Sequence, residues 1–207
     1  MEVHKILPIL ILFFVWGAKP GPHTITLIFR SISHGTRAGV AIAIGNNLCH
    51  LVYFWSVFLA LHLFTLHSTL LTVVRLVSAI YIIGYAVWDI WTTRVPAENI
   101  DRKGILASIA SGFVVGLMNP LNASFYLAVV PELQDYKFTT DEVLVVSFVV
   151  FFALLSGQFF YIAFADIMRR IVEDPVRRRM LLIVSNILFA GIGVYIIAQV
   201  VSQMSAS

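Results

Sequence analysis

Six long apolar stretches, separated by short polar connections, run through the sequence. Each has about 20 residues or more and few charged side chains, which is the length that an α-helix needs to cross a bilayer. The pattern predicts an all-helical polytopic membrane protein with six transmembrane helices. Because every connection is short, residues 1–207 are expected to form a single membrane domain. The expected spans are Ile6–Phe29, Ala38–Leu61, Leu70–Trp91, Ile105–Val130, Val143–Ala165 and Met180–Val201.

The first apolar stretch is interrupted by Trp16-Gly17-Ala18-Lys19-Pro20-Gly21-Pro22-His23. The two prolines remove backbone donors and free carbonyl groups one turn earlier in the helix. In hydrocarbon these groups need partners, so a broken helix is tolerated where the backbone is buried or lines a polar cavity. We therefore expect a helix break that lines a cavity. The candidate residues are Lys19, Pro20, Gly21, Pro22 and His23.

The fourth apolar stretch contains a second interruption, Gly116-Leu117-Met118-Asn119-Pro120. Three spans reverse the orientation of the next three, so the sequence predicts two inverted three-helix repeats, roughly residues 1–95 and 104–207. In each repeat the first helix is broken by proline. The second span of each has a glycine followed by an amide, Gly45-Asn46 and Gly157-Gln158. Paired breaks in corresponding segments indicate a transporter binding site near the midplane.

Each break is followed by a new helix N-terminus, whose free N–H groups and dipole favour an anion. A carboxylate would find donors near His23 or Asn122, and the freed carbonyls could accept from an ammonium group. An amino acid carries both groups. The amides have an alternative role as hydrogen-bonding contacts between helices. The further substrate-binding candidates are Asn46, Asn119, Pro120, Asn122 and Gln158.

Ionisable residues inside the spans are functional candidates, and each has a structural alternative. An unperturbed histidine titrates near physiological pH, so His50 is a candidate for proton coupling; alternatively it is a neutral histidine bonded to a neighbouring helix. Lys19 either pairs with a substrate carboxylate or satisfies the carbonyls freed by the break. Asp89 is a second proton-coupling candidate, although pairing with Arg94 is the favoured interpretation. Arg75, near the outer end of its span, is expected to extend to the membrane surface.

Positive charge alternates along the connections. Lysine and arginine are concentrated in the first, third and fifth connections, whereas the second connection and the tail after Val201 have none. The fourth connection has one lysine, Lys137, against the acidic residues Glu132, Asp135, Asp141 and Glu142. Cytoplasmic connections carry an excess of these residues. We therefore expect the first, third and fifth connections in the cytoplasm and both termini outside it.

Composition supports the membrane class and narrows the chemistry. Of the 207 residues, 59% are apolar and 12% are charged, with a mean hydropathy of +0.91, whereas a soluble domain is about a quarter charged. The single cysteine, Cys49, lies within a span, which excludes disulfides and thiolate metal sites as organising features. The net charge of +3 does not indicate nucleic acid, because the basic residues flank spans. We expect no cofactor and no resident metal.

Two signature segments give a specific resemblance. Pro20-Gly21-Pro22 with Ser33-His34-Gly35-Thr36-Arg37-Ala38-Gly39 resembles the opening signature of the lysine-exporter (LysE-type, RhtB-type) family of amino-acid efflux transporters. Gly112 to Pro120, followed by Phe125-Tyr126-Leu127-Ala128-Val129-Val130-Pro131, resembles its second signature. The resemblance covers nearly the whole chain. It implies export of amino acids or close derivatives across a bacterial inner (plasma) membrane, driven by the proton gradient.

Four residues, at three places in the chain, depart from the family pattern. Cys49 and His50 stand where many members have glycine and then an acidic residue, and Leu121 replaces a lysine that often follows Asn-Pro. Lys19 stands where the family usually has a small or neutral residue. The loss of an acid and the gain of a base argue against a cationic substrate such as lysine and favour a neutral or acidic solute.

Two other classes of function remain as alternatives. A membrane enzyme is disfavoured, because the sequence has no Gly-x-Ser-x-Gly, no paired intramembrane aspartates and no His-Glu-x-x-His. A divalent-cation exporter of a related fold would need several carboxylates or histidines within the spans, where only His50 and Asp89 occur. Small residues such as Ala41, Ala43 and Gly45 permit close helix packing within a subunit or in a homo-oligomer.

Overall fold

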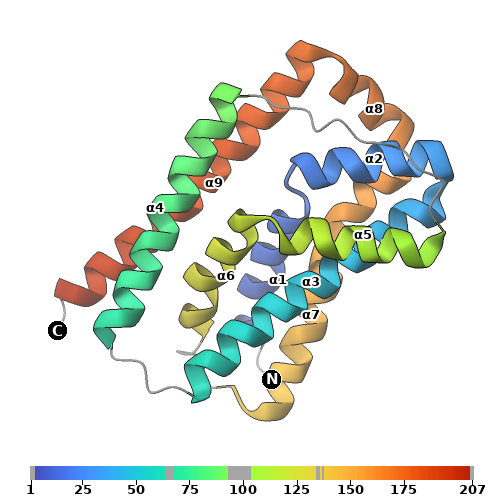
Figure 1. The fold of residues 1–207 in the computed structure, drawn as a ribbon. Coiled ribbons are helices and arrows are strands. Elements are labelled where there is room, and N and C mark those ends of the chain that lie inside the picture. The colour runs from blue at the N-terminus through green and yellow to red at the C-terminus, as the bar shows by residue number, and fades with distance from the viewer. Residues whose placement is uncertain (1–2, 64–67, 93–103, 134–135, 137, 206–207) are drawn as a thin grey trace.

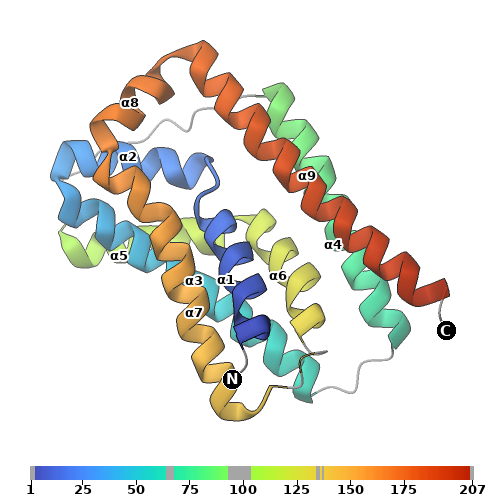
Figure 2. The same cartoon turned by 180° about the vertical axis from the view of Figure 1, so that it is seen from behind.

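The computed structural model of the chain describes residues 3–63, 68–92, 104–133, 136 and 138–205. In this part of the chain the regular structure is entirely α-helical (Figure 1). α1 begins and α9 ends on one side of the molecule, opposite the side that carries α2 and α8 (Figures 1 and 2). The helices are α1 (Val3–Gly17), α2 (Pro22–His34), α3 (Thr36–Leu63), α4 (Ser68–Thr92), α5 (Ile105–Leu117), α6 (Pro120–Leu133), α7 (Thr140–Ala163), α8 (Ala165–Glu173) and α9 (Pro175–Ser205).

Four of the described helices are long and apolar enough to span a membrane: α3, α4, α7 and α9. α5 and α6 form a fifth span if they are counted together, with a bend of 67° between them. These five correspond to five of the six expected spans. The chain is therefore a polytopic helical membrane protein.

The expected first span, Ile6–Phe29, is not a continuous membrane-crossing helix. It is divided into α1 and α2, and the 15 residues of α1 cover only about 22 Å, less than the roughly 30 Å of a hydrocarbon core. α2 is amphipathic rather than uniformly apolar: Ile25 and Ile28 are buried and pack against Met168 and Val172 of α8. An apolar count along the sequence does not reveal that the chain changes direction at the prolines.

α8 occupies a segment that we expected to be the fifth connection. Its buried residues are Ala165 and Val172, while Arg169 and Glu173 form an i,i+4 ion pair of 2.7 Å on its exposed side. The apolar positions recur at helical spacing among the arginines. The charged residues correctly indicate a polar segment. The helical spacing of its apolar residues also makes it a helix, which covers α2.

Close approach of helix backbones holds the broken helices against two long ones. A Cβ atom on Gly17 or Gly157 would collide with backbone atoms of the facing helix, where α1 crosses α7. The same is true of Gly45 and Gly112, where α3 crosses α5. The small residues of α3 thus serve packing within the chain, while oligomerisation stays a prediction.

α4 and α9 pack side by side along their length (Figure 1). Near one end of the pair, Arg75 of α4 forms an ion pair with Glu132 of α6 and donates to Gln203 of α9 across 3.0 Å. Arg75 is only 8% exposed, so the expectation that it extends to the membrane surface is wrong. A partly buried carboxylate partner on another helix holds the guanidinium inside the protein.

Candidate functional site

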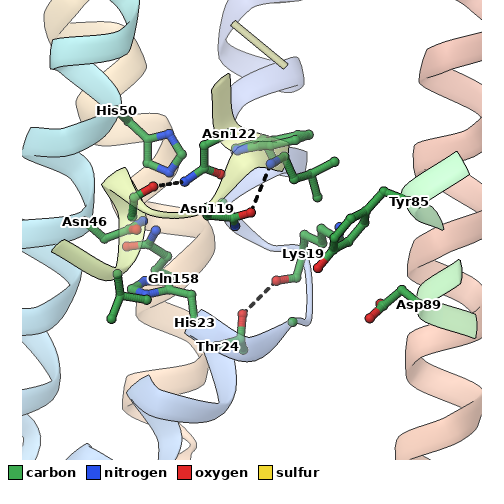
Figure 3. A pocket seen from close by; sticks show the side chains of 16 residues that line it. Lys19, His23, Thr24, Asn46, His50, Tyr85, Asp89, Asn119, Asn122 and Gln158 are labelled. Carbon is green, nitrogen blue, oxygen red and sulfur yellow. Dashed lines mark hydrogen bonds between the residues drawn. The ribbon is translucent and has the colours of Figure 1, made fainter. Parts of the chain in front are cut away.

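One cavity of about 60 Å³ lies where the two helix breaks face each other (Figure 3). Its wall combines backbone from both breaks with polar side chains from α2, α3, α4, α6 and α7. Most of these side chains are buried. The lining residues are Trp16, Gly17, Lys19, Gly21, His23, Thr24, Asn46, His50, Tyr85, Asp89, Val115, Gly116, Asn119, Leu121, Asn122 and Gln158.

The first break leaves residues 18–21 outside regular helix between α1 and α2. The Thr24 hydroxyl donates to the carbonyl oxygen of Lys19 across 2.7 Å, and the Tyr161 hydroxyl of α7 donates to that of Ala18 across 2.6 Å. Both carbonyls are therefore satisfied by hydroxyl groups, as burial in an apolar environment requires. The Lys19 side chain is not needed for this task.

The second break is shorter, with Met118 and Asn119 between α5 and α6. Asn119 Oδ1 accepts from the backbone N–H of Leu121 across 3.1 Å, and Asn122 Nδ2 donates to the carbonyl oxygen of Gly116 across 2.9 Å. The Tyr53 hydroxyl of α3 donates to the Leu117 carbonyl across 2.6 Å. Both amides thus serve the broken backbone, in addition to lining the cavity.

Four polar side chains form a neutral wall: Asn46 and His50 of α3, His23 of α2 and Gln158 of α7 (Figure 3). Asn46, His50 and Gln158 are each at most 3% exposed. Among the described residues, no hydrogen-bond partner faces either ring nitrogen of His23, Nδ1 of His50 or Oε1 of Gln158. Buried polar atoms are usually hydrogen-bonded, so this wall has capacity for water or a polar ligand.

A cation and an anion lie on the opposite side of the cavity. The Lys19 ammonium is 4.0 Å from the ring centroid of Phe189 and 5.4 Å from that of Tyr85. Asp89 is 8% exposed and accepts a hydrogen bond of 2.8 Å from Asn186 Nδ2 of α9. Figure 3 shows Tyr85 and Asp89 entering from α4, with Lys19 between them and the neutral wall.

The structure brings most sequence-derived candidates together at this cavity. Seven of the ten substrate-binding candidates and both proton-coupling candidates line it; their roles in binding and coupling stay predictions. Pro20 and Pro120 are not among the lining residues, because their contribution is to break the helices. Pro22 begins α2. The seven are Lys19, Gly21, His23, Asn46, Asn119, Asn122 and Gln158, and the other two are His50 and Asp89.

Sequence reasoning missed the aromatic side of the cavity. Tyr85 lies one helical turn from Asp89, and this i,i+4 spacing places both on one face of α4. The spacing is the sequence feature that could have revealed Tyr85. Phe189 of α9 had no such signal. The expected partner of Asp89, Arg94, lies outside the described residues, and within them Asn186 takes that place.

A second cavity of about 590 Å³ lies between α1, α6 and α9, with Ile9, Val129 and Ile196 in its wall. Aromatic side chains occupy the interval between the two cavities along α1 and α6. Trp16 stacks on Phe125 with ring centroids 3.6 Å apart, and Phe13 meets Phe125 edge-on at 5.6 Å. In the described part of the chain, no three His, Cys, Asp or Glu side chains gather closely enough to hold a metal ion.

A bundle of membrane-spanning helices with two helix breaks around a buried polar cavity is typical of membrane transporters. The family model of the LysE type translocators matches residues 14–200, and the chain belongs to that family. It is therefore a membrane translocator of small solutes. The chain is also similar to an uncharacterized membrane protein of Vibrio cholerae serotype O1, with 25% identity over 142 residues, covering 65% of this chain and 67% of the relative. No solved structure matches it.

Proposed function

We propose that this chain exports amino acids or close derivatives from the cytoplasm across a bacterial inner membrane, with proton coupling, by alternating access around the central cavity. The observation that carries the proposal is the convergence of both helix breaks on one buried polar cavity with unused hydrogen-bonding capacity. Discontinuous helices meeting near mid-membrane are the usual construction of a transporter substrate site.

The two charges of the cavity suit a zwitterion. Among the described residues, no ion pair within 4.0 Å joins Lys19 to Asp89, although both line the cavity. An amino acid between them would place its carboxylate toward Lys19 and its ammonium toward Asp89. At an effective dielectric constant of about 20, unit charges about 4 Å apart attract by roughly 4 kcal/mol. Both ends of the solute would therefore contribute to its binding.

Reciprocal contacts support two inverted repeats of three spans. The broken helix of each half packs through glycine on the second span of the other half, α1 on α7 and α5 on α3. A tyrosine of each second span donates to a carbonyl in the opposite break, Tyr161 to Ala18 and Tyr53 to Leu117. An inverted repeat would relate these pairs, and the halves roughly 1–95 and 104–207 would then be the natural units of the rocking motion.

Differences between the two ends support an inward-facing state. α4, the third span of the first half, packs against α6, which follows the break of the second half. The corresponding helix of the second half, α9, packs on α4 and α8. Within the described helices it has no comparable packing on α2, which follows the break of the first half. The aromatic cluster of Phe13, Trp16 and Phe125 separates the central cavity from the second one. The central cavity has room for only a few water molecules, so an amino acid would require the surrounding helices to separate.

Proton coupling is assigned to Asp89 and His50. Both are buried at the cavity, where binding of a proton changes the local charge that the solute meets. Asp89 is the better candidate for the proton-coupling residue, because it lies on α4 and hydrogen-bonds to α9. These two helices differ in their packing against the broken helices.

The test is efflux of preloaded radiolabelled amino acids from cells that express the chain, with and without an uncoupler. We expect loss of accumulated neutral amino acid, abolished by the uncoupler and by Pro20→Ala. Asp89→Asn should slow efflux roughly ten- to a hundredfold, since a hydrogen bond to a charged group contributes about 1.5–3 kcal/mol. The matched control is Gly84→Ala, because a Cβ there meets no atom within 4 Å.

Two outcomes would contradict this proposal. If no amino acid leaves the cells but intracellular divalent metal falls, the protein is a cation exporter. If amino acids leave equally well in the presence of the uncoupler, transport is not proton-coupled.

A further inference from the structure

The ammonium of Lys19 is surrounded by three aromatic rings from three helices. Its Nζ lies 4.0 Å from the ring centroid of Phe189 in α9, 5.4 Å from Tyr85 in α4 and 6.0 Å from Trp16 in α1. Trp16 and Phe189 also contact each other, with centroids 4.7 Å apart. A cation within about 6 Å of an aromatic face is attracted by the ring quadrupole, and cages of such rings recognise ammonium ligands.

We call the rings of Trp16, Tyr85 and Phe189 the aromatic cage. The Lys19 ammonium inside it is not needed as a hydrogen-bond donor to the broken backbone. The carbonyls of Ala18 and Lys19 already accept hydrogen bonds from Tyr161 and Thr24. The ammonium is therefore available to occupy the cage, and the nearby carboxylate of Asp89 strengthens the attraction of this site for a positive charge.

We propose that Lys19 is a tethered cation that fills an ammonium subsite formed by Trp16, Tyr85 and Phe189, and that it thereby excludes solutes with a cationic side group from the cavity. This inference rests on the proposed function and deepens it by naming the substrate class. Once the helices separate, a zwitterion with a neutral side group can bind with its carboxylate toward Lys19. An additional cation on the solute finds the cage filled and meets a like charge.

The first test is binding of tetramethylammonium to the purified full-length protein in lipid nanodiscs, measured by calorimetry at constant ionic strength. Wild-type protein should show no saturable binding, whereas Lys19→Met should bind the probe saturably, with an affinity at least about tenfold above the detection limit of the wild-type titration. Lys19→Arg, which retains a cation, should behave as wild type. Adding Tyr85→Leu to Lys19→Met should weaken binding at least about threefold, since one ring of the cage is lost.

The inference is overturned if folded Lys19→Met binds tetramethylammonium no better than wild type, or if wild type itself binds it saturably. Should Lys19→Met fail to fold, binding of the probe to Lys19→Gln and the wild-type transport assay still test the inference. In that assay wild type should export lysine and arginine at least about tenfold more slowly than neutral amino acids. Equal export of cationic and neutral amino acids would refute the exclusion.

The binding and transport arms separate the two proposals. If wild type exports neutral amino acids but Lys19→Met and Lys19→Gln gain no cation binding, the exporter stands and the cage inference fails. If wild type exports no amino acid but Lys19→Met binds tetramethylammonium, the cage stands and the proposed substrate is wrong.

Discussion

The two helix breaks of this protein have the same construction but expose different chemistry. Each lies beside a glycine contact with a long helix of the other half, and each has a carbonyl that accepts a tyrosine hydroxyl from that helix. The first leaves residues 18–21 outside regular helix, whereas the second leaves only Met118 and Asn119. The wider break can aim a side chain into the cavity.

The residues within the breaks show what the difference achieves. In the second break, Asn119 and Asn122 turn back to hydrogen-bond their own backbone. In the first break, Lys19 extends away from the backbone to the rings of α4 and α9. We conclude that the second break is a scaffold of the cavity, and that the first supplies its positive charge.

The largest expected effect tests the shared construction. Gly45→Ala and Gly157→Ala should each destabilise the protein by about 2–3 kcal/mol, because the added Cβ overlaps backbone atoms of the facing helix and overpacking of this kind costs about 1–3 kcal/mol or more. The measurement is the free energy of unfolding by SDS titration in mixed micelles.

Gly84→Ala is the matched control, since the same methyl group meets open space there. It should stabilise α4 slightly, as alanine is favoured over glycine within a helix by about 1 kcal/mol. If only one of the two glycine contacts proved sensitive, the equivalence of the two breaks would be lost.

A smaller effect should separate scaffold from charge carrier. Asn122→Leu removes the donor to the Gly116 carbonyl, and Thr24→Val removes the donor to the Lys19 carbonyl. A buried acceptor left without its partner costs about 1–3 kcal/mol. Asn122→Leu should cost about 2 kcal/mol, and Thr24→Val about 1 kcal/mol, because the partly buried Lys19 carbonyl is closer to water in the cavity.

The two variants should also differ in selectivity. Thr24→Val loosens the backbone that carries Lys19, so it should raise export of cationic amino acids relative to neutral ones, whereas Asn122→Leu should lower export of both alike. Equal effects on selectivity would show that the two breaks do not divide scaffold and charge between them.

The positions of the breaks could be predicted from the sequence because proline acts locally. Pro20 and Pro120 interrupt the backbone whatever surrounds them, and the helices end within a few residues of both. The direction of the chain after a break is set by tertiary packing. The course of α2 follows from its contact with α8, and neither the contact nor α8 itself could be read from an apolar count.

The polar half of the candidate site was accessible to sequence reasoning, and the aromatic half was not. Amides, histidines and an aspartate are rare inside spans, so Asn46, His50 and Asp89 were conspicuous. Aromatic residues are frequent throughout the chain, and only the arrangement of helices shows that Tyr85 and Phe189 face Lys19. The error at Arg75 has a similar cause: depth alone was considered, and its partner Glu132 comes from another helix.

The smallest effect concerns the two tyrosine hydroxyls that reach the breaks from the opposite half of the protein. Tyr161→Phe and Tyr53→Phe each remove one hydroxyl donor to a break carbonyl while preserving the ring. Tyr161 is 6% exposed, so its loss should cost about 1 kcal/mol, a typical net value for one hydrogen bond. Tyr53 is less buried and water can replace its hydroxyl, so we expect about 0.5 kcal/mol. The same SDS titration measures both. A larger cost for Tyr53→Phe would mean that the second break, not the first, depends more on the opposite half of the protein.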